Sequence, residues 1–206
     1  YGIPSLILFG ACAPIAAFLA DKWNRSSMLT VFFFGIGSAS VMTGLAQSLL
    51  QVGIGLSLIG IFASIYHPVG IAMLIERGVK VGWLLGMNGV WGNMGVATAP
   101  LVTGFILAQY DWRMAFIIPG AFSIIIGISY LLYTRSYAVR TAINNENIKD
   151  HVGFAPGWQR ALVSLALVTA AGGFVFGGMT FLIPRLFDEK MQGISSDIAV
   201  TGSLAA

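Results

Sequence analysis

The chain has 206 residues, of which 57% are hydrophobic and only 9% are charged, and its mean hydropathy is +0.84. Soluble domains carry about a quarter of charged residues, so this composition excludes an ordinary water-soluble protein. The net charge of +3 comes from basic residues scattered over short segments, not from the continuous patch of a nucleic-acid-binding protein. With one Cys and two His, the sequence predicts no disulfide framework, no metal site and no cofactor.

The charged residues leave long apolar runs between them. A helix needs about 20 mostly apolar residues to cross the hydrocarbon core of a membrane. We predict an all-α polytopic membrane helix bundle with six spans: Tyr1–Ala20, Met28–Gln47, Leu50–Ile75, Trp83–Tyr110, Trp112–Tyr133 and Arg160–Leu186. A seventh span begins near Ser196, and we expect the chain to be a fragment of a longer protein. A very apolar soluble helical protein is the alternative, but its helices would carry polar faces that these runs lack.

Lys and Arg are distributed unevenly between the two ends of the predicted spans. Eight lie on one side: Lys22, Arg25, Arg77, Lys80, Arg135, Arg140, Lys149 and Arg160. Three lie on the other: Arg113, Arg185 and Lys190. Because cytoplasmic loops carry an excess of basic residues, the side with eight is predicted to face the cytoplasm. The segment Thr134–Trp158 then forms the longest cytoplasmic connection.

A charged turn, Ala17–Leu29 with the sequence AFLADKWNRSSML, separates the first two spans. It resembles the loop between the second and third helices of the major facilitator superfamily of secondary transporters, G-x-L-A-D-R-x-G-R-K-x-x-L. Matching residues are Leu19, Ala20, Asp21, Arg25 and Leu29, with Lys22 a conservative change, whereas Ala17, Asn24 and Ser26 depart from the pattern.

The resemblance implies that Asp21, Lys22 and Arg25 form a gate at the cytoplasmic side, with Glu76 in the next turn as a partner for Arg25. Exposed ion pairs contribute about 0–1 kcal/mol each. That is enough to bias two conformations of similar energy. The alternative is that these charges only hold the loop on the cytoplasmic side.

The same resemblance implies a partial fold of two six-helix halves, with the observed spans as the second to seventh helices. Residues 1–135 would then be the N-terminal half without its first helix. Residues 136–158 would be the cytoplasmic loop between the halves, and residues 159–206 would begin the C-terminal half.

The fourth span carries a glycine motif. It resembles the antiporter and drug-exporter motif G-x8-G-x3-G-P-x2-G-G through Gly86, Gly95, Pro100 and Gly104, while Ala99 and Thr103 replace glycines. Small residues let helices approach closely in lipid, and Pro removes a backbone donor and can kink a helix. The motif therefore indicates either a tight helix interface or a pivot between the two halves.

Within the third span, Tyr66-His67-Pro68-x-Gly70 resembles a helix of fosmidomycin-resistance-like exporters. An ionisable side chain at membrane depth is a functional candidate, and His titrates nearest neutrality. We predict that His67 and Tyr66 take part in proton or substrate binding. Alternatively, His67 is neutral and donates to the Ser64 carbonyl, which Pro68 leaves without a helical donor. Further polar candidates inside the spans are Asn88, Asn93 and Thr180.

The segment Asp111-Trp112-Arg113 resembles the G-W-R-x-x-F start of the superfamily's sixth helix. Trp112 suits the aromatic belt of a membrane, and Arg113 is expected to anchor the helix by reaching lipid headgroups.

These observations predict a secondary active transporter, not an enzyme, which moves a small organic solute by alternating access and proton-coupled export. An importer or symporter of a small metabolite or anion remains open, as does a non-transporting sensor. The expected partners are the small-molecule substrate, protons and the lipid bilayer, with no nucleic acid. We expect a multi-pass, monomeric protein of the bacterial inner membrane.

A membrane enzyme would need clustered His or acidic residues, and nucleotide coupling would need a phosphate-binding loop; neither is present in the sequence.

Overall fold

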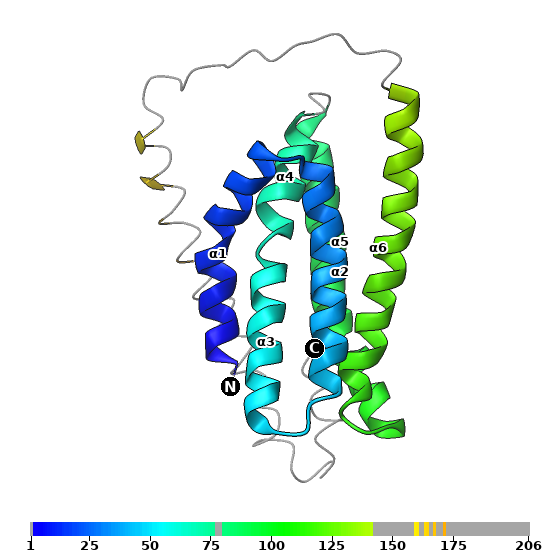
Figure 1. The fold of residues 1–206 in the computed structure, drawn as a ribbon. Coiled ribbons are helices and arrows are strands. Elements are labelled where there is room, and N and C mark those ends of the chain that lie inside the picture. Colours follow the sequence, from blue (N-terminus) through cyan, green and yellow to red (C-terminus); the bar gives the residue numbers. More distant parts are fainter. Residues whose placement is uncertain are drawn as a thin grey trace.

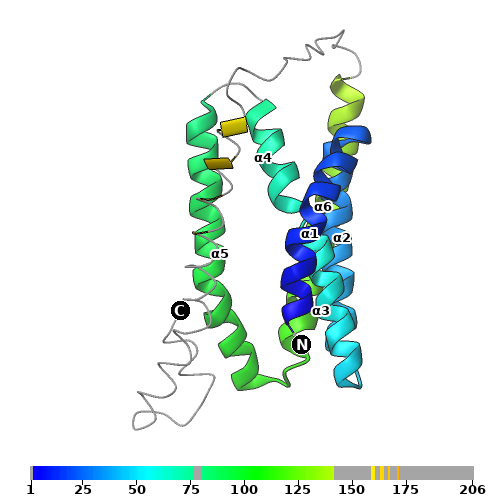
Figure 2. The ribbon, with the colours of Figure 1, turned by 90° about the vertical axis from the view of Figure 1, so that its left-hand side faces the viewer.

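The computed structural model describes residues 2–76 and 80–141, together with residues 159, 160, 163, 164, 167 and 171. In this part of the chain the regular structure is entirely helical. The elements are α1 (Ile3–Lys22), α2 (Arg25–Gly44), α3 (Leu49–Ala63), α4 (Tyr66–Glu76), α5 (Val81–Gln109) and α6 (Met114–Thr141). Figure 1 shows α1, α2, α3 and α6 side by side, while Figure 2 shows α5 standing apart from them. Among the described elements, α5 has its main contacts with α4 and α6.

Within residues 2–76 and 80–141, five segments are long and apolar enough to cross a membrane: Ile3–Lys22, Arg25–Gly44, Leu49–Glu76, Val81–Gln109 and Met114–Arg135. They confirm the first five predicted spans to within a few residues. The helix α6 continues to Thr141, past the predicted span end at Tyr133 and into the predicted 136–158 loop. The predicted span Arg160–Leu186 lies mostly outside the described residues, and the one near Ser196 lies wholly outside them.

Polar side chains determine where two of the helices begin. Asn24 has extended backbone, and its Oδ1 accepts hydrogen bonds from the backbone N–H of Ser26 at 2.8 Å and of Ser27 at 3.2 Å. The Ser48 hydroxyl accepts from the Gln51 N–H at 3.3 Å at the start of α3. Such caps satisfy N–H groups that have no partner in the first turn of a helix.

The predicted third span is interrupted. The helix α3 ends at Ala63 and α4 begins at Tyr66, so Ser64 and Ile65 form a turn inside the span. Pro68 has no N–H to donate to the Ser64 carbonyl, which removes one helical bond at this level. The Ser64 hydroxyl donates to the Ile61 carbonyl at 2.6 Å, and the Ile65 N–H donates to the Phe62 carbonyl at 3.2 Å. Both tighten the turn without continuing an α-helix.

The antiparallel helices α2 and α6 pack most extensively, and polar contacts recur along the pair. The Ser26 and Tyr130 hydroxyls share a hydrogen bond of 3.1 Å. The Ser123 hydroxyl donates to the Phe33 carbonyl at 3.1 Å, and the Ser40 hydroxyl donates to the Phe116 carbonyl at 2.7 Å. On each helix these positions are seven residues apart, which is two helical turns.

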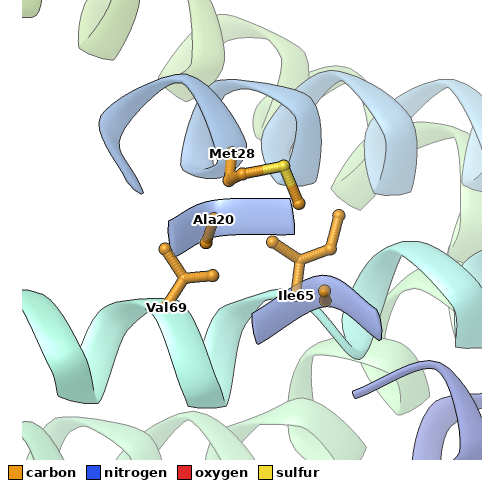
Figure 3. Packing of buried hydrophobic residues seen from close by; sticks show 5 residues of the cluster. Ala20, Met28, Ile65 and Val69 are labelled. Carbon is orange, nitrogen blue, oxygen red and sulfur yellow. The ribbon is translucent and has the colours of Figure 1, made fainter. Parts of the chain in front are cut away.

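The buried core lies where α1, α2 and α4 meet below the charged turn. It contains Ala16, Ala20, Met28, Ile65 and Val69, of which Val69 is only 1% exposed (Figure 3). Many large apolar side chains elsewhere face outward, such as Phe18 at 65% and Leu50 at 71% exposed. An apolar exterior of this kind suits contact with lipid tails.

Candidate functional site

A charged network joins three helices at one end of the bundle. Arg25 is the first residue of α2, and its Nη2 lies 2.8 Å from Oδ1 of Asp21, in the last turn of α1. Its Nη1 lies 2.6 Å from Oε1 of Glu76, the last residue of α4. The predicted pairing of Arg25 with Glu76 is therefore present. One guanidinium connects the ends of α1, α2 and α4.

The network is partly exposed. The Arg25 side chain is 27% exposed, whereas those of Asp21 and Glu76 are 65% and 61% exposed. Screening by water limits each exposed pair to about 0–1 kcal/mol. Lys22, the other predicted gating residue, is exposed and has no ion pair within the described part of the chain. The network is thus too weak to hold the fold together, but it can shift a balance between two arrangements of α4.

The helix α4 carries the charged network at one end and the predicted binding residues at the other. Tyr66 is its first residue, and the Tyr66 hydroxyl donates to Oδ1 of Asn88 on α5 at 2.9 Å. The turn at Ser64 and Ile65 lies immediately before Tyr66. Therefore α4 is a short segment whose two ends contact α5 and the start of α2.

His67 belongs to an aromatic cluster, which we define as Phe9, Phe32, Tyr66 and His67. The His67 ring lies 6.0 Å from the Phe9 ring and 5.6 Å from the Tyr66 ring, both edge-on, and Tyr66 lies 5.4 Å from Phe32. The described contacts of His67 are therefore with rings, not the predicted hydrogen bond to the Ser64 carbonyl. His67 itself is exposed.

The structure brings together three of the predicted binding residues, Tyr66, His67 and Asn88, on α4 and α5. Asn93 is further along α5, is exposed, and has no recorded polar contact among the described residues. Thr180 lies outside the described residues.

The glycine motif of α5 has no described neighbour. A Cβ added at Gly86 or Gly95 would meet nothing within 4 Å, and Ala99 and Pro100 are exposed. The helix runs unbroken through Pro100, whereas the chain breaks next to Pro68. Gly104 is half-buried close to the end of α5 that lies next to α6. Among the described residues, no neighbour packs closely against Gly86 or Gly95, so the predicted tight interface is not seen at these two glycines.

Arg113 has a role that the sequence did not indicate. Its Nη1 donates to the Gly44 carbonyl at 3.1 Å and to the Ala46 carbonyl, and its guanidinium lies 4.9 Å from the centroid of the Trp112 ring. Arg113 was predicted to reach outward to lipid headgroups. In the structure it caps the C-terminus of α2 instead. A basic side chain near the last carbonyls of a helix stabilises them. The sequence singles out Arg113 through the Asp111-Trp112-Arg113 segment, but it does not show which carbonyls the side chain would bind.

Comparison with known proteins identifies the family. The family model described as Major Facilitator Superfamily matches residues 2–206. The chain belongs to the Major Facilitator Superfamily. Two superfamily relatives are multidrug resistance proteins named MdtG. The one from Citrobacter koseri is 30% identical over 204 residues, covering 97% of this chain and 50% of the relative. The one from a Rahnella species is 29% identical over 203 residues, covering 97% and 49%.

This superfamily chain spans about half the length of the curated relatives it matches. No solved structure matches it. With five membrane-length segments among the described residues, the chain is a multi-pass membrane protein.

The described contacts separate the two ends of the superfamily chain. Arg25 and Glu76 lie together at one end, where a cavity also joins Asn24 to Arg135. Arg113 contacts Gly44 and Ala46 at the other. This division agrees with the uneven distribution of Lys and Arg on which the predicted orientation rests.

Proposed function

We propose that the full-length protein is a secondary transporter of the bacterial inner membrane that exports small amphipathic organic compounds in exchange for protons. The observation that carries this proposal is the Arg25 network, because a weak link between three helix ends is suited to a gate. The direction of transport rests on the relatives from Citrobacter koseri and Rahnella, whose names state multidrug resistance.

In this proposal α4 responds to the gate. When Arg25 releases Glu76, the cytoplasmic end of α4 is free to swing about the turn at Ser64 and Ile65. Pro68 lowers the free energy needed to bend this turn, because it has no backbone N–H and so no hydrogen bond has to be broken there. Tyr66 and His67 lie on α4 and shift with it, so the hydrogen bond from Tyr66 to Asn88 changes as α4 moves.

The aromatic cluster supports an apolar, ring-bearing substrate. Edge-on aromatic contacts are favourable by about 0.5–1.5 kcal/mol beyond area burial, and a bound ring would extend the same arrangement. His67 is the exposed polar member of this cluster and is the one His within the described spans. His67 is the proposed proton-binding group, because an ionisable side chain within a membrane span is a functional candidate.

The test is solute flux in membrane vesicles that carry the full-length protein. Everted vesicles should accumulate a fluorescent lipophilic dye when a proton gradient is imposed, and an uncoupler should abolish the accumulation. Accumulation only in right-side-out vesicles would favour an importer. Absence of flux in either orientation, with the protein correctly inserted, would favour a sensor and contradict the proposal.

A further inference from the structure

A cavity lined mostly by polar residues lies at the charged end of the α2–α6 pair. Its volume is about 320 Å³, at the lower end of the range for small-molecule sites. It is lined by Asn24, Ser26, Ser27, Thr30, Leu131, Thr134 and Arg135. Five of these are neutral polar residues, one is Leu and one is Arg. The transport mechanism proposed above uses none of them.

Several hydrogen-bond donors of the lining residues have no acceptor in the part of the chain that the structure describes. Asn24 uses its carbonyl oxygen to cap α2, which leaves its amide NH2 group available. The Thr30 and Thr134 hydroxyls already donate to the Ser26 and Leu131 carbonyls, and the Ser26 hydroxyl shares a hydrogen bond with Tyr130. Among the described residues, no hydrogen bond of the Ser27 hydroxyl or of the Arg135 guanidinium is recorded. The cavity therefore offers a surplus of donors to a ligand.

The charge of the cavity has one sign. Arg135 is positive, and no lining residue is acidic. The nearest acid along the chain, Asp21, is already bound by Arg25. Guanidinium and hydroxyl donors without a competing carboxylate suit an anion with several acceptor oxygens, of which a phosphate group is the commonest in a membrane.

The position of the cavity indicates that the phosphate belongs to a lipid headgroup and not to a soluble anion. It lies where the spans Arg25–Gly44 and Met114–Arg135 both leave the hydrocarbon core. This is the level of the lipid headgroups. We propose that the cavity binds the headgroup of an anionic phospholipid in the leaflet on the side of the charged turn. A zwitterionic lipid is disfavoured because its ammonium group would find no carboxylate in the lining.

The experiment is native mass spectrometry of the full-length protein reconstituted in an equimolar mixture of phosphatidylglycerol, phosphatidylethanolamine and phosphatidylcholine. The wild type should retain phosphatidylglycerol preferentially. Arg135→Gln should lower this retention about tenfold, since it removes the charged partner of the phosphate. Ser27→Leu keeps the charge but fills the cavity, and it should lower retention in the same way.

The matched control is Lys22→Gln, which removes one exposed positive charge at the same membrane surface but outside the cavity. It should change retention by less than about twofold, because diffuse surface attraction is screened. Equal loss in Lys22→Gln and Arg135→Gln would overturn the proposal. So would competition by millimolar inorganic phosphate without any preference among the three lipids, which would assign the cavity to a soluble anion. Dye flux is measured separately, so loss of transport alone leaves this result intact.

Discussion

At the scale of single residues, Arg25 connects the ends of three helices. It takes one carboxylate from its own turn, at Asp21, and one from a helix that ends 51 positions later, at Glu76. Removal of either carboxylate leaves the other in place, so the network should weaken without collapsing. The core of Ala20, Met28 and Val69 beneath it remains packed in both cases.

Asp21→Asn is therefore expected to reduce the transport rate while membrane insertion and folding stay intact. The ion pair with Arg25 is lost, and the cost to stability is expected to be under about 1 kcal/mol because Asp21 is mostly exposed. Initial rates of dye flux in vesicles, normalised to inserted protein, measure the effect. Lys80→Gln is the control, since Lys80 is an exposed charge outside the predicted gate. An unchanged rate in Asp21→Asn would count against a gating role.

A second residue-scale prediction concerns the contact between α4 and α5. Tyr66→Phe keeps the ring within the aromatic cluster but removes the hydroxyl that donates to Asn88 at 2.9 Å. We expect a loss of about 0.5–1.5 kcal/mol in unfolding free energy. The double variant with Asn88→Ala should cost less than the sum of the two single variants. Strict additivity in thermal unfolding would show that the two side chains do not interact in the protein.

These residues differ in how far the sequence could reveal them. Asp21 and Arg25 are four positions apart in one charged turn, so their proximity follows from the short connection between α1 and α2. Arg113 binds carbonyls 67 and 69 positions earlier in the chain, and nothing in its neighbourhood indicates those partners. His67 was singled out by its charge and depth, but the Phe9 ring that contacts it lies on another helix.

At the scale of elements, two Pro residues have different outcomes. Pro68 stands next to a break, whereas Pro100 lies within an unbroken α5. The local sequence alone does not separate them, because both lack an N–H. Around Pro68, the Ser64 hydroxyl turns back to the Ile61 carbonyl, and Ile65 is buried in the core, so packing holds the turn in place.

Pro68→Ala should therefore straighten the junction of α3 and α4 and slow transport. It restores a backbone donor where an interior Pro costs a helix about 3 kcal/mol. Spin labels at positions 50 and 74, in a variant whose Cys12 is replaced by Ser, would report the distance across the junction. A longer and narrower distance distribution is expected. Pro100→Ala is the control for the distance, which it should leave unchanged because Pro100 lies on α5.

The α2–α6 pair should tolerate no added volume at its glycines. A Cβ at Gly120 would lie 2.8 Å from the Gly37 carbonyl oxygen, which belongs to backbone and cannot turn away. Gly120→Ala is expected to destabilise the protein by about 1–3 kcal/mol through overpacking. Gly10→Ala on α1, where a Cβ would meet nothing within 4 Å, should be neutral or stabilising. Denaturant unfolding in detergent measures both, and equal stabilities would contradict the close approach.

The regular spacing in this pair shows why the sequence alone did not predict it. Ser26, Phe33 and Ser40 recur every seven residues, and so do Phe116, Ser123 and Tyr130. Each series is inconspicuous by itself, because single hydroxyls are common in apolar helices. Only the antiparallel pairing of the two helices brings the series together.

At the scale of the whole molecule, the described contacts define two ends with different chemistry. One end holds the Arg25 network and the donor-rich cavity, and the other holds Arg113 against the end of α2. The helices between them expose apolar side chains to the surroundings. This arrangement requires the molecule to lie across the membrane, with each end at its own surface.

The orientation is testable with single Cys residues placed at the two ends. In a Cys12→Ser background, a Cys at Ser27 or Lys80 should react with a membrane-impermeant maleimide only after the cells are opened, because the basic side is predicted to be cytoplasmic. A Cys at Ser48 or Asp111 should react in intact cells. These positions are chosen because Ser48 and Asp111 lie in turns at the Arg113 end, whereas Ser27 and Lys80 lie near helix starts at the Arg25 end. Labelling of Ser27→Cys in intact cells would show that the topology is the opposite of the predicted one. The proposed direction of transport would then be contradicted as well.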